Sequence, residues 1–188
     1  MRAGRSEDGI AEGKRAVSLD PLSVDASRSL GEDYYFARRY DESIAQLRQT
    51  VQMKPGYWFA HLNLGLSYLY AGKVTEGVEE LETAYRLEPD IPDSLADLGL
   101  GYAVAGQTDK ARAVLQKLQG PWPHAYVAPY HVAVIYAALG DKDRAFAWLD
   151  KAYQERSIFM TFIKTDPEMD SLRSDKRFAA LTQRVGLR

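Results

Sequence analysis

The chain has no cysteine among its 188 residues, so disulfides, thiolate metal sites and cysteine nucleophiles are excluded. It also has no apolar run close to the roughly 20 residues that a membrane-spanning helix needs. The N-terminal stretch is charged and lacks the apolar core of a signal peptide. These absences predict no membrane insertion and a cytoplasmic protein.

An excess of positive charge is missing as well. The chain carries 24 Lys and Arg against 26 Asp and Glu, for a net charge of −2. A surface for nucleic acid or for an anionic membrane would need a basic excess, so neither is expected as a partner. RNA binding by helical repeats is a third hypothesis, besides the two functions described below. It is disfavoured, because it requires polar base-reading side chains on a basic surface.

The sequence also lacks residue patterns that are typical of catalytic sites or metal-binding sites. The three histidines, His61, His124 and His131, do not pair at helical spacing with one another or with a carboxylate cluster. Gly99, Gly101 and Gly106 do not have the spacing of a dinucleotide-binding loop. The sequence therefore predicts a protein that is not an enzyme and that needs no cofactor and no metal.

What the sequence does contain is an internal repeat of 34 residues. Tyrosines and leucines recur at this step: Tyr34, Tyr68, Tyr102 and Tyr136, and Leu47, Leu81, Leu115 and Leu149. A repeat of this length is typical of a stacked array of helical hairpins, each of which buries its apolar face only against its neighbours. Such arrays present a long concave surface, which favours binding over catalysis.

Small residues mark where the two helices of each hairpin should cross. With repeats starting at Val24, Trp58, Pro92 and Tyr126, the eighth and twentieth positions are all small: Gly31, Gly65, Gly99 and Ala133, and Ser43, Gly77, Ala111 and Ala145. Two helices approach closely only where side chains are small, so these positions predict the contact point. Gly72, Gly106 and Gly140 are expected to end first helices, whereas Arg38 predicts a different turn in the first repeat.

These residues, with prolines closing the repeats at Pro55, Pro89 and Pro123, resemble the tetratricopeptide repeat family over about residues 24–157. The resemblance implies an all-α, right-handed solenoid of antiparallel helical hairpins. The expected helix pairs are 24–37 and 41–53, 58–71 and 74–87, 92–105 and 108–118, and 126–139 and 142–155. The expected organisation is one continuous domain of an N-terminal half-repeat or capping helix (1–23), four repeats (24–57, 58–91, 92–125, 126–157) and a C-terminal helical cap (158–188).

The two ends leave alternatives open. The stretch from Ile10 to Pro21 looks like the second helix of a preceding repeat, which would make the chain a fragment of a longer array, or else a solitary capping helix. Residues 158–163 are apolar and need cover, and Asp166 and Asp175 are placed to cap helices. This tail resembles the segment that closes tetratricopeptide arrays in bacterial multidomain signalling proteins, such as serine/threonine kinases and winged-helix regulators. The resemblance implies that the chain is an arm of such a protein.

The first helix of each hairpin is expected to line the concave side. That face is polar in the first repeat and apolar from the second repeat onward. The predicted groove residues are Phe59, Leu62, Leu66, Leu69, Tyr70, Leu100, Val104, Val127, Tyr130 and Val134. An apolar surface of this extent usually marks an interaction site.

Two functions follow from this groove. The first is a protein-interaction module that binds a peptide or a partner helix. The second is a self-associating scaffold whose groove is filled by residues 158–163 or by a second copy in a homodimer. In the family, domains that clamp the C-terminal carboxylate of chaperones carry lysine and asparagine at two groove positions. Those positions hold Arg28 and Glu32, then Leu62 and Leu66, so this carboxylate clamp is not expected.

Overall fold

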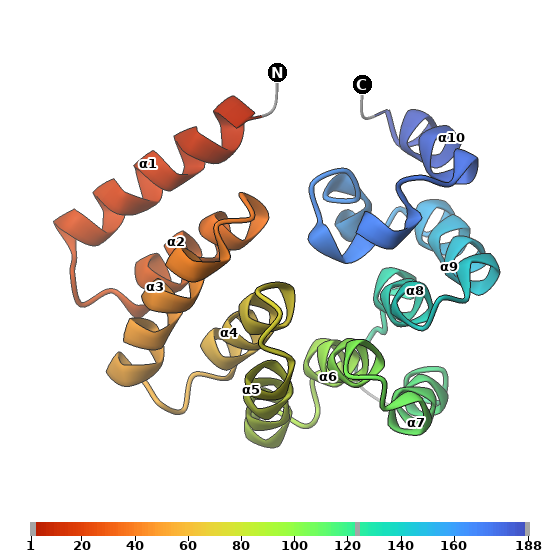
Figure 1. The fold of residues 1–188 in the computed structure, drawn as a ribbon, viewed down its shortest axis with the longest axis horizontal. Coiled ribbons are helices and arrows are strands. Elements are labelled where there is room, and N and C mark those ends of the chain that lie inside the picture. The colour runs from red at the N-terminus through yellow and green to blue at the C-terminus, as the bar shows by residue number, and fades with distance from the viewer. Residues whose placement is uncertain (1–2, 123–124, 187–188) are drawn as a thin grey trace. The chain divides into compact units, whose positions relative to one another are not determined.

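The structure is a computed structural model that describes residues 3–122 and 125–186 (Figure 1). Over these residues the chain is helical and contains no strand. The helices are α1 (Ala3–Leu19), α2 (Val24–Phe36), α3 (Tyr40–Met53), α4 (Trp58–Tyr70), α5 (Val74–Leu87), α6 (Pro92–Val104), α7 (Thr108–Leu118), α8 (Pro129–Ala138), α9 (Lys142–Gln154), η1 (Ile158–Thr161), η2 (Pro167–Leu172) and α10 (Lys176–Arg184). They form two compact units, unit 1 (Met1–Pro89) with α1–α5 and unit 2 (Asp90–Arg188) with α6–α10.

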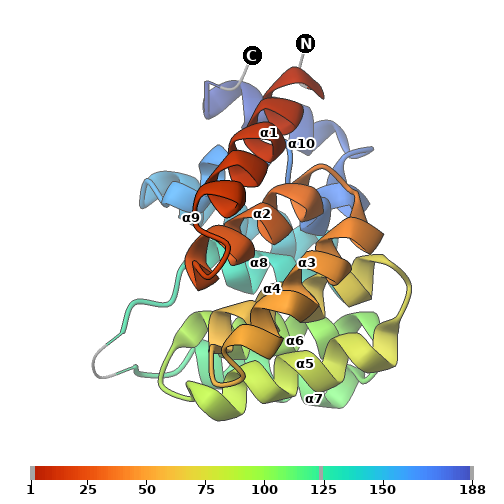
Figure 2. The same ribbon diagram turned by 90° about the vertical axis from the view of Figure 1, so that its left-hand side faces the viewer.

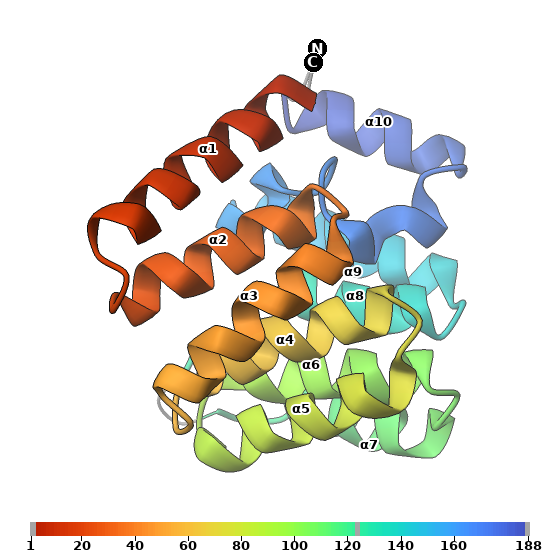
Figure 3. The same ribbon diagram turned by 60° about the vertical axis from the view of Figure 1, so that its left-hand side comes forward.

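The predicted solenoid of helical hairpins is confirmed, and its helices cross at the small residues. In unit 1, α4 lies beside α5 (Figure 3). Gly65 and Gly77 are in contact where the two helices meet. A Cβ atom on Gly65 would lie 2.9 Å from the carbonyl oxygen of Gly77, closer than real side chains approach backbone. In α3, Ser43 takes the equivalent place and donates a 2.6 Å hydrogen bond to the carbonyl of Gly31. Position twenty therefore allows the close approach in both hairpins of this unit.

The turns inside the hairpins share one geometry, including the turn that was predicted to differ. Gly72, Gly106 and Gly140 have φ between 71° and 79°, in the left-handed region. Arg38 has φ 62°, so the first repeat makes the same turn without glycine, and the prediction of a different turn is wrong. The cause lies in the backbone, because the N–H after this residue donates to the carbonyl of Tyr34 at 2.9 Å, as the N–H after Gly72 does to Tyr68.

One predicted helix begins later than expected. The first helix of the fourth repeat was expected from residue 126, but α8 begins at Pro129. Ala128, the residue before it, is extended with ψ 126°, as a following proline demands. The missed signal was the proline itself, which fits the first turn of a helix and not a place three residues inside one.

The N-terminal helix is longer than the predicted stretch and lies along α2 (Figure 2). Ile10 is buried with Leu30 and Tyr34, and Val17 packs against this cluster. Gly13 brings the backbone of α1 close to Leu30, whose Cδ1 would lie 3.1 Å from an added Cβ. The helix therefore covers an apolar face of the first hairpin in unit 1.

The C-terminal tail of unit 2 uses both predicted caps. Asp166 accepts a 2.9 Å hydrogen bond from the N–H of Glu168 at the start of η2. Asp175 accepts one of 2.9 Å from the N–H of Arg177 at the start of α10. The segment after Asp166 is a 3-10 helix rather than an α-helix. Pro123 and His124, which figured in the sequence interpretation, lie outside the described residues.

Candidate functional site

The candidate site is the surface formed by the first helix of each hairpin, here called the first-helix face. In unit 1 it belongs to α2 and α4, and in unit 2 to α6 and α8. On α4 the predicted groove residues Leu62, Leu66 and Leu69 are buried, whereas Phe59 and Tyr70 are half-buried. Leu69 packs over Gly77 inside its own hairpin rather than facing outward. Among the predicted groove residues of this helix, the two aromatic rings are therefore the ones with accessible surface.

The ring of Phe59, at the start of α4, is already in contact with a side chain of α2. The guanidinium of Arg28 lies 4.4 Å from the centre of the Phe59 ring and 2.9 Å from a carboxylate oxygen of Glu32. Tyr57 donates a 2.6 Å hydrogen bond to Asp25 beside it. The polar first repeat therefore covers part of the apolar second repeat within unit 1.

In unit 2 the predicted groove residues divide into covered and open ones. Leu100, Tyr130 and Val134 are buried, each at 2% exposure or less. Val127 is half-buried, and Val104, the last residue of α6, is 41% exposed. Val104 is therefore the predicted contact that is most accessible on the first-helix face of this unit.

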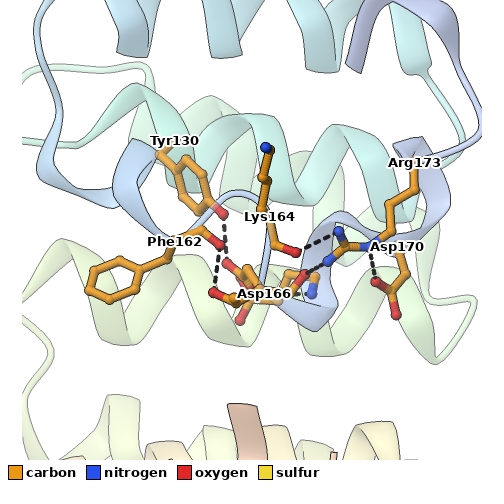
Figure 4. Close-up of polar contacts among 8 residues, drawn as sticks. Tyr130, Phe162, Lys164, Asp166, Asp170 and Arg173 are labelled. Carbon is orange, nitrogen blue, oxygen red and sulfur yellow. Dashed lines mark hydrogen bonds and ion pairs between the residues drawn. The ribbon is translucent and has the colours of Figure 1, made fainter. Parts of the chain in front are cut away.

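The chain's own tail covers part of α8. The ring of Phe159 stacks on that of Tyr130 with 5.9 Å between centres, and η2 packs on the same helix. The hydroxyl of Tyr130 donates a 2.6 Å hydrogen bond to Asp166 (Figure 4). On the other side of Asp166, Arg173 donates to the carbonyls of Lys164 and Asp166 at 2.7 Å and 2.9 Å. Part of the first-helix face thus holds a polypeptide segment.

A cluster of titratable groups lies beside this contact. His131 on α8 has its ring centre 4.4 Å from that of Phe159. Its Nδ1 atom lies 3.3 Å from a carboxylate oxygen of Asp93 on α6, near enough for an ion pair but not aligned for a hydrogen bond. Asp97, one helical turn after Asp93, has no hydrogen bond or ion pair among the described residues.

Burial controls the charges of this cluster. It raises the pKa of Asp97 to about 7, against the attraction of His131 and with the help of Asp93 and Asp166. Burial also raises the pKa of Asp166, although hydrogen bonds from Tyr130 and from a backbone N–H oppose the change. Burial alone would lower the pKa of His131, but Asp93 and the other carboxylates raise it above its usual value.

Sequence reasoning did not single out this cluster as a site. Asp93 and Asp97 were not among the predicted site residues, and His131 was considered only as a histidine that does not pair at helical spacing. The available signal was the repeat register, because Asn63, Asp97 and His131 recur at the same 34-residue step on largely apolar helices. Asn63 is also buried, and its side-chain oxygen has no hydrogen-bond partner in the part of the chain that is described.

Two cavities in unit 2 lie away from the cluster. One of about 310 Å³ lies between α7 and α9 and is lined by Arg112, Gln119 and Arg144 among others. The other, of about 250 Å³, is lined by Trp122, Tyr126 and Trp148. The indole of Trp122 donates a 3.1 Å hydrogen bond to the carbonyl of Lys117, so this residue contributes to local packing.

Metal and membrane sites find no support in the described residues. No group of three histidine, cysteine or acidic side chains among them is arranged to hold a metal ion. Within residues 3–122 and 125–186, no helix has the length and apolar character that crossing a membrane requires.

Comparison with known proteins agrees with this arrangement. A family model described as tetratricopeptide repeat matches the chain over residues 1–57, 29–90, 62–126 and 97–157. The chain belongs to the tetratricopeptide repeat family. No curated protein matches this tetratricopeptide repeat chain in sequence.

Solved structures of tetratricopeptide repeat proteins share the fold. A thermophilic protein of Thermus thermophilus, TTC0263, aligns with a TM-score of 0.67 at 21% identity, over 96% of this chain and 92% of its own. MamA aligns with a TM-score of 0.57 at 24% identity, over 81% of this chain and 90% of its own. YrrB, described as having an unusual peptide-binding site, aligns at 0.52 and 19% identity, over 96% of this chain and 84% of its own. Proteins of this family generally act in protein–protein interaction.

Proposed function

We propose that this chain is a polypeptide-binding module, and that a peptide or a partner helix binds on its first-helix faces. The observation that carries the proposal is the tail of unit 2, an irregular segment that packs on α8 through Phe159 and the hydrogen bond from Tyr130 to Asp166. A face that accepts one such segment has the apolar surface and the polar groups to accept another beside it. The peptide-binding site reported for YrrB supports the proposal by analogy.

The predicted contact residues are not equally suited to a test. Leu66 and Val134 are 7% and 2% exposed, so a glutamate at either place would bury a charge and destabilise the fold. Val104 is 41% exposed and offers a substitution that the fold tolerates. The matched control is Leu87, which is 38% exposed and is likewise the last residue of its helix, but on the second helix of a hairpin.

The test is a selection of displayed random peptides on the full chain, followed by affinity measurements on the peptides recovered. Val104→Glu is expected to weaken binding about tenfold, since about 1.4 kcal/mol of apolar contact is lost, while Leu87→Glu leaves affinity unchanged. Failure to select any peptide would overturn the proposed function. Equal losses in the two variants would remove the first-helix face as the binding surface.

The alternative function is a self-associating scaffold. The tail on α8 favours it in part, because that contact fills the fourth repeat with the chain's own residues. A homodimer predicts that the mass measured by light scattering rises with concentration, and that Val104→Glu restores the monomer. A mass that stays constant would exclude the second copy as the occupant.

The cellular setting is also part of the proposal. We infer a non-enzymatic, cytoplasmic chain that serves as an arm of a larger bacterial signalling or regulatory protein. The support is the resemblance of the segment around Asp166 and Asp175 to the closing segment of such arrays. Immunoblotting of the native protein tests this inference, because a band near 21.1 kDa, the mass of this chain, would contradict the larger host.

A further inference from the structure

The cavity between α7 and α9 in unit 2 occupies the repeat position of an apolar cluster in unit 1. Between the first two hairpins, that cluster consists of the buried residues Ile44, Leu47, Leu64 and Tyr68, with Val51 and Ala71 packed against them. Two repeats of 34 residues further along the chain, five of these six positions line the cavity of about 310 Å³: Arg112, Leu115, Gln119, Tyr136 and Leu139. The same register that gives packed side chains in unit 1 therefore gives a cavity in unit 2.

Two polar residues in this register distinguish the cavity from the cluster. Arg112 stands at the position of Ile44 and Val78, which are only 6% and 8% exposed, whereas Arg112 itself is exposed. Gln119 stands at the position of Val51, which packs on the apolar cluster. The apolar contacts of the earlier repeats are thus not made here, and their loss lowers stability. Such a loss is expected where the polar side chains serve a ligand rather than the fold.

Positive charge is in excess around the cavity. Arg112 makes no hydrogen bond, ion pair or ring contact within the part of the chain that the structure describes. Arg144 has its Nε atom 3.5 Å from Oδ2 of Asp141, longer than a good hydrogen bond, and its guanidinium lies 5.6 Å from the centre of the Tyr136 ring. The carboxylate of Asp141 also accepts a 3.1 Å hydrogen bond from the N–H of Arg144 and caps α9. Two guanidinium groups therefore share one carboxylate that is already engaged.

We propose that this cavity binds a small organic anion whose carboxylate or phosphate group lies between Arg112 and Arg144. A guanidinium group donates charge-assisted hydrogen bonds to the oxygens of a carboxylate or a phosphate, often two at a time. The site belongs to the second helices α7 and α9, so it is separate from the first-helix faces. It goes beyond the proposed function and does not depend on it.

The rest of the lining fits a small ligand of this kind. Leu115 is buried and Leu139 is half-buried, and they give the cavity an apolar part. The side chain of Gln119 donates a 3.2 Å hydrogen bond to the hydroxyl of Tyr136, whose own proton has no acceptor among the described residues and can be donated to the anion. Ligand pockets in proteins begin at about 300 Å³, so the volume suits a small molecule.

The test titrates benzoate, its neutral isostere benzamide, and phenyl phosphate into the full chain, followed by NMR of the side-chain amide of Gln119. Benzoate is expected to bind at least about tenfold more tightly than benzamide, as charge-assisted contacts require, and to bind less tightly as salt is added. The tighter of benzoate and phenyl phosphate identifies the anionic group that the cavity prefers. Equal binding of benzoate and benzamide, or no binding of either anion, would overturn the anion site.

Arg112→Gln should remove the preference for benzoate over benzamide. The matched control is Arg48→Gln, because Arg48 is likewise an exposed arginine without a partner among the described residues, on the second helix α3; it should keep the preference. Arg112→Ile restores the residue type of Ile44, so it should abolish benzoate binding and raise Tm by about 2–4 °C through apolar contact. Unchanged benzoate binding in Arg112→Gln, or a lower Tm in Arg112→Ile, would contradict a ligand-binding role for Arg112.

Discussion

The close approach of α4 and α5 at Gly65 makes an alanine at this residue costly. The added Cβ would lie 2.7 Å from Cγ of Leu81 and 2.9 Å from the carbonyl oxygen of Gly77. The backbone atom cannot rotate away, so the two helices must separate. Overpacking of this kind costs about 1–3 kcal/mol, and the better helix propensity of alanine returns up to about 1 kcal/mol. Gly65→Ala is therefore expected to destabilise the fold by about 1–2 kcal/mol.

The matched control is Gly9→Ala in α1. The nearest atom to a Cβ on Gly9 is Oδ1 of Asp33 at 3.4 Å, which is ordinary contact. The same chemical change should therefore stabilise the helix by up to about 1 kcal/mol. Thermal unfolding followed by circular dichroism should show changes in Tm of opposite sign for the two variants, with a fall of about 2–8 °C for Gly65→Ala.

Hydrogen exchange can show which of the two units Gly65→Ala destabilises. Because the chain forms two compact units, one unfolding curve does not report on each unit separately. Amides of α4 and α5 are expected to exchange faster in Gly65→Ala, while those of α8 and α9 in unit 2 are unchanged. A Gly65→Ala variant as stable as the wild type would show that position eight is not the crossing point.

Three further predictions concern a turn, a histidine and the tail. Arg156 has φ 55°, so Arg156→Gly is expected to raise stability by about 1 kcal/mol in thermal unfolding, and a loss would contradict the strain. The hydrogen bond to Glu80 raises the pKa of His61, so the stabilisation that this pair gives is complete below about pH 6.5 and is lost as pH rises through the raised pKa. His61→Gln should therefore flatten the fall in unfolding free energy with pH, measured by urea unfolding. An unchanged pH profile would refute the role of this pair. Arg173→Met removes the donors to two tail carbonyls and should speed hydrogen exchange in residues 158–172 but not in unit 1; equal protection would show that the tail is held by apolar contacts alone.

Much of the fold could be predicted because each repeat carries the same residue types at the same structural positions. The crossing at Gly65 and Gly77 followed from small residues at two fixed positions, and the structure has them in contact. The turn at Arg38 could not be predicted in the same way. A left-handed residue normally indicates glycine, but here the hydrogen bond to the carbonyl of Tyr34 imposes the conformation on arginine.

The candidate site was less predictable because exposure depends on what covers a helix. The spacing of residues on α8 indicated that Tyr130 and Val134 face the groove, and it could not show that the tail lies on Tyr130. The polar groups of Asp97 and His131 belong to helices that come together only on folding. Their pKa values depend on burial and on Asp166, which lies 35 residues beyond His131 in the chain.

The sequence alone indicated the family, the hairpins and the crossing at Gly65 and Gly77, because these depend on interactions within one repeat or between adjacent repeats. Tertiary structure decided which apolar residues are covered and which carboxylates meet an imidazole, because both follow from segments distant in the chain. Val104 stays exposed while Val134 is buried, although both were predicted on the same face. Val104 is the last residue of α6, whereas α8 is packed by α6, by α9 and by the tail in unit 2.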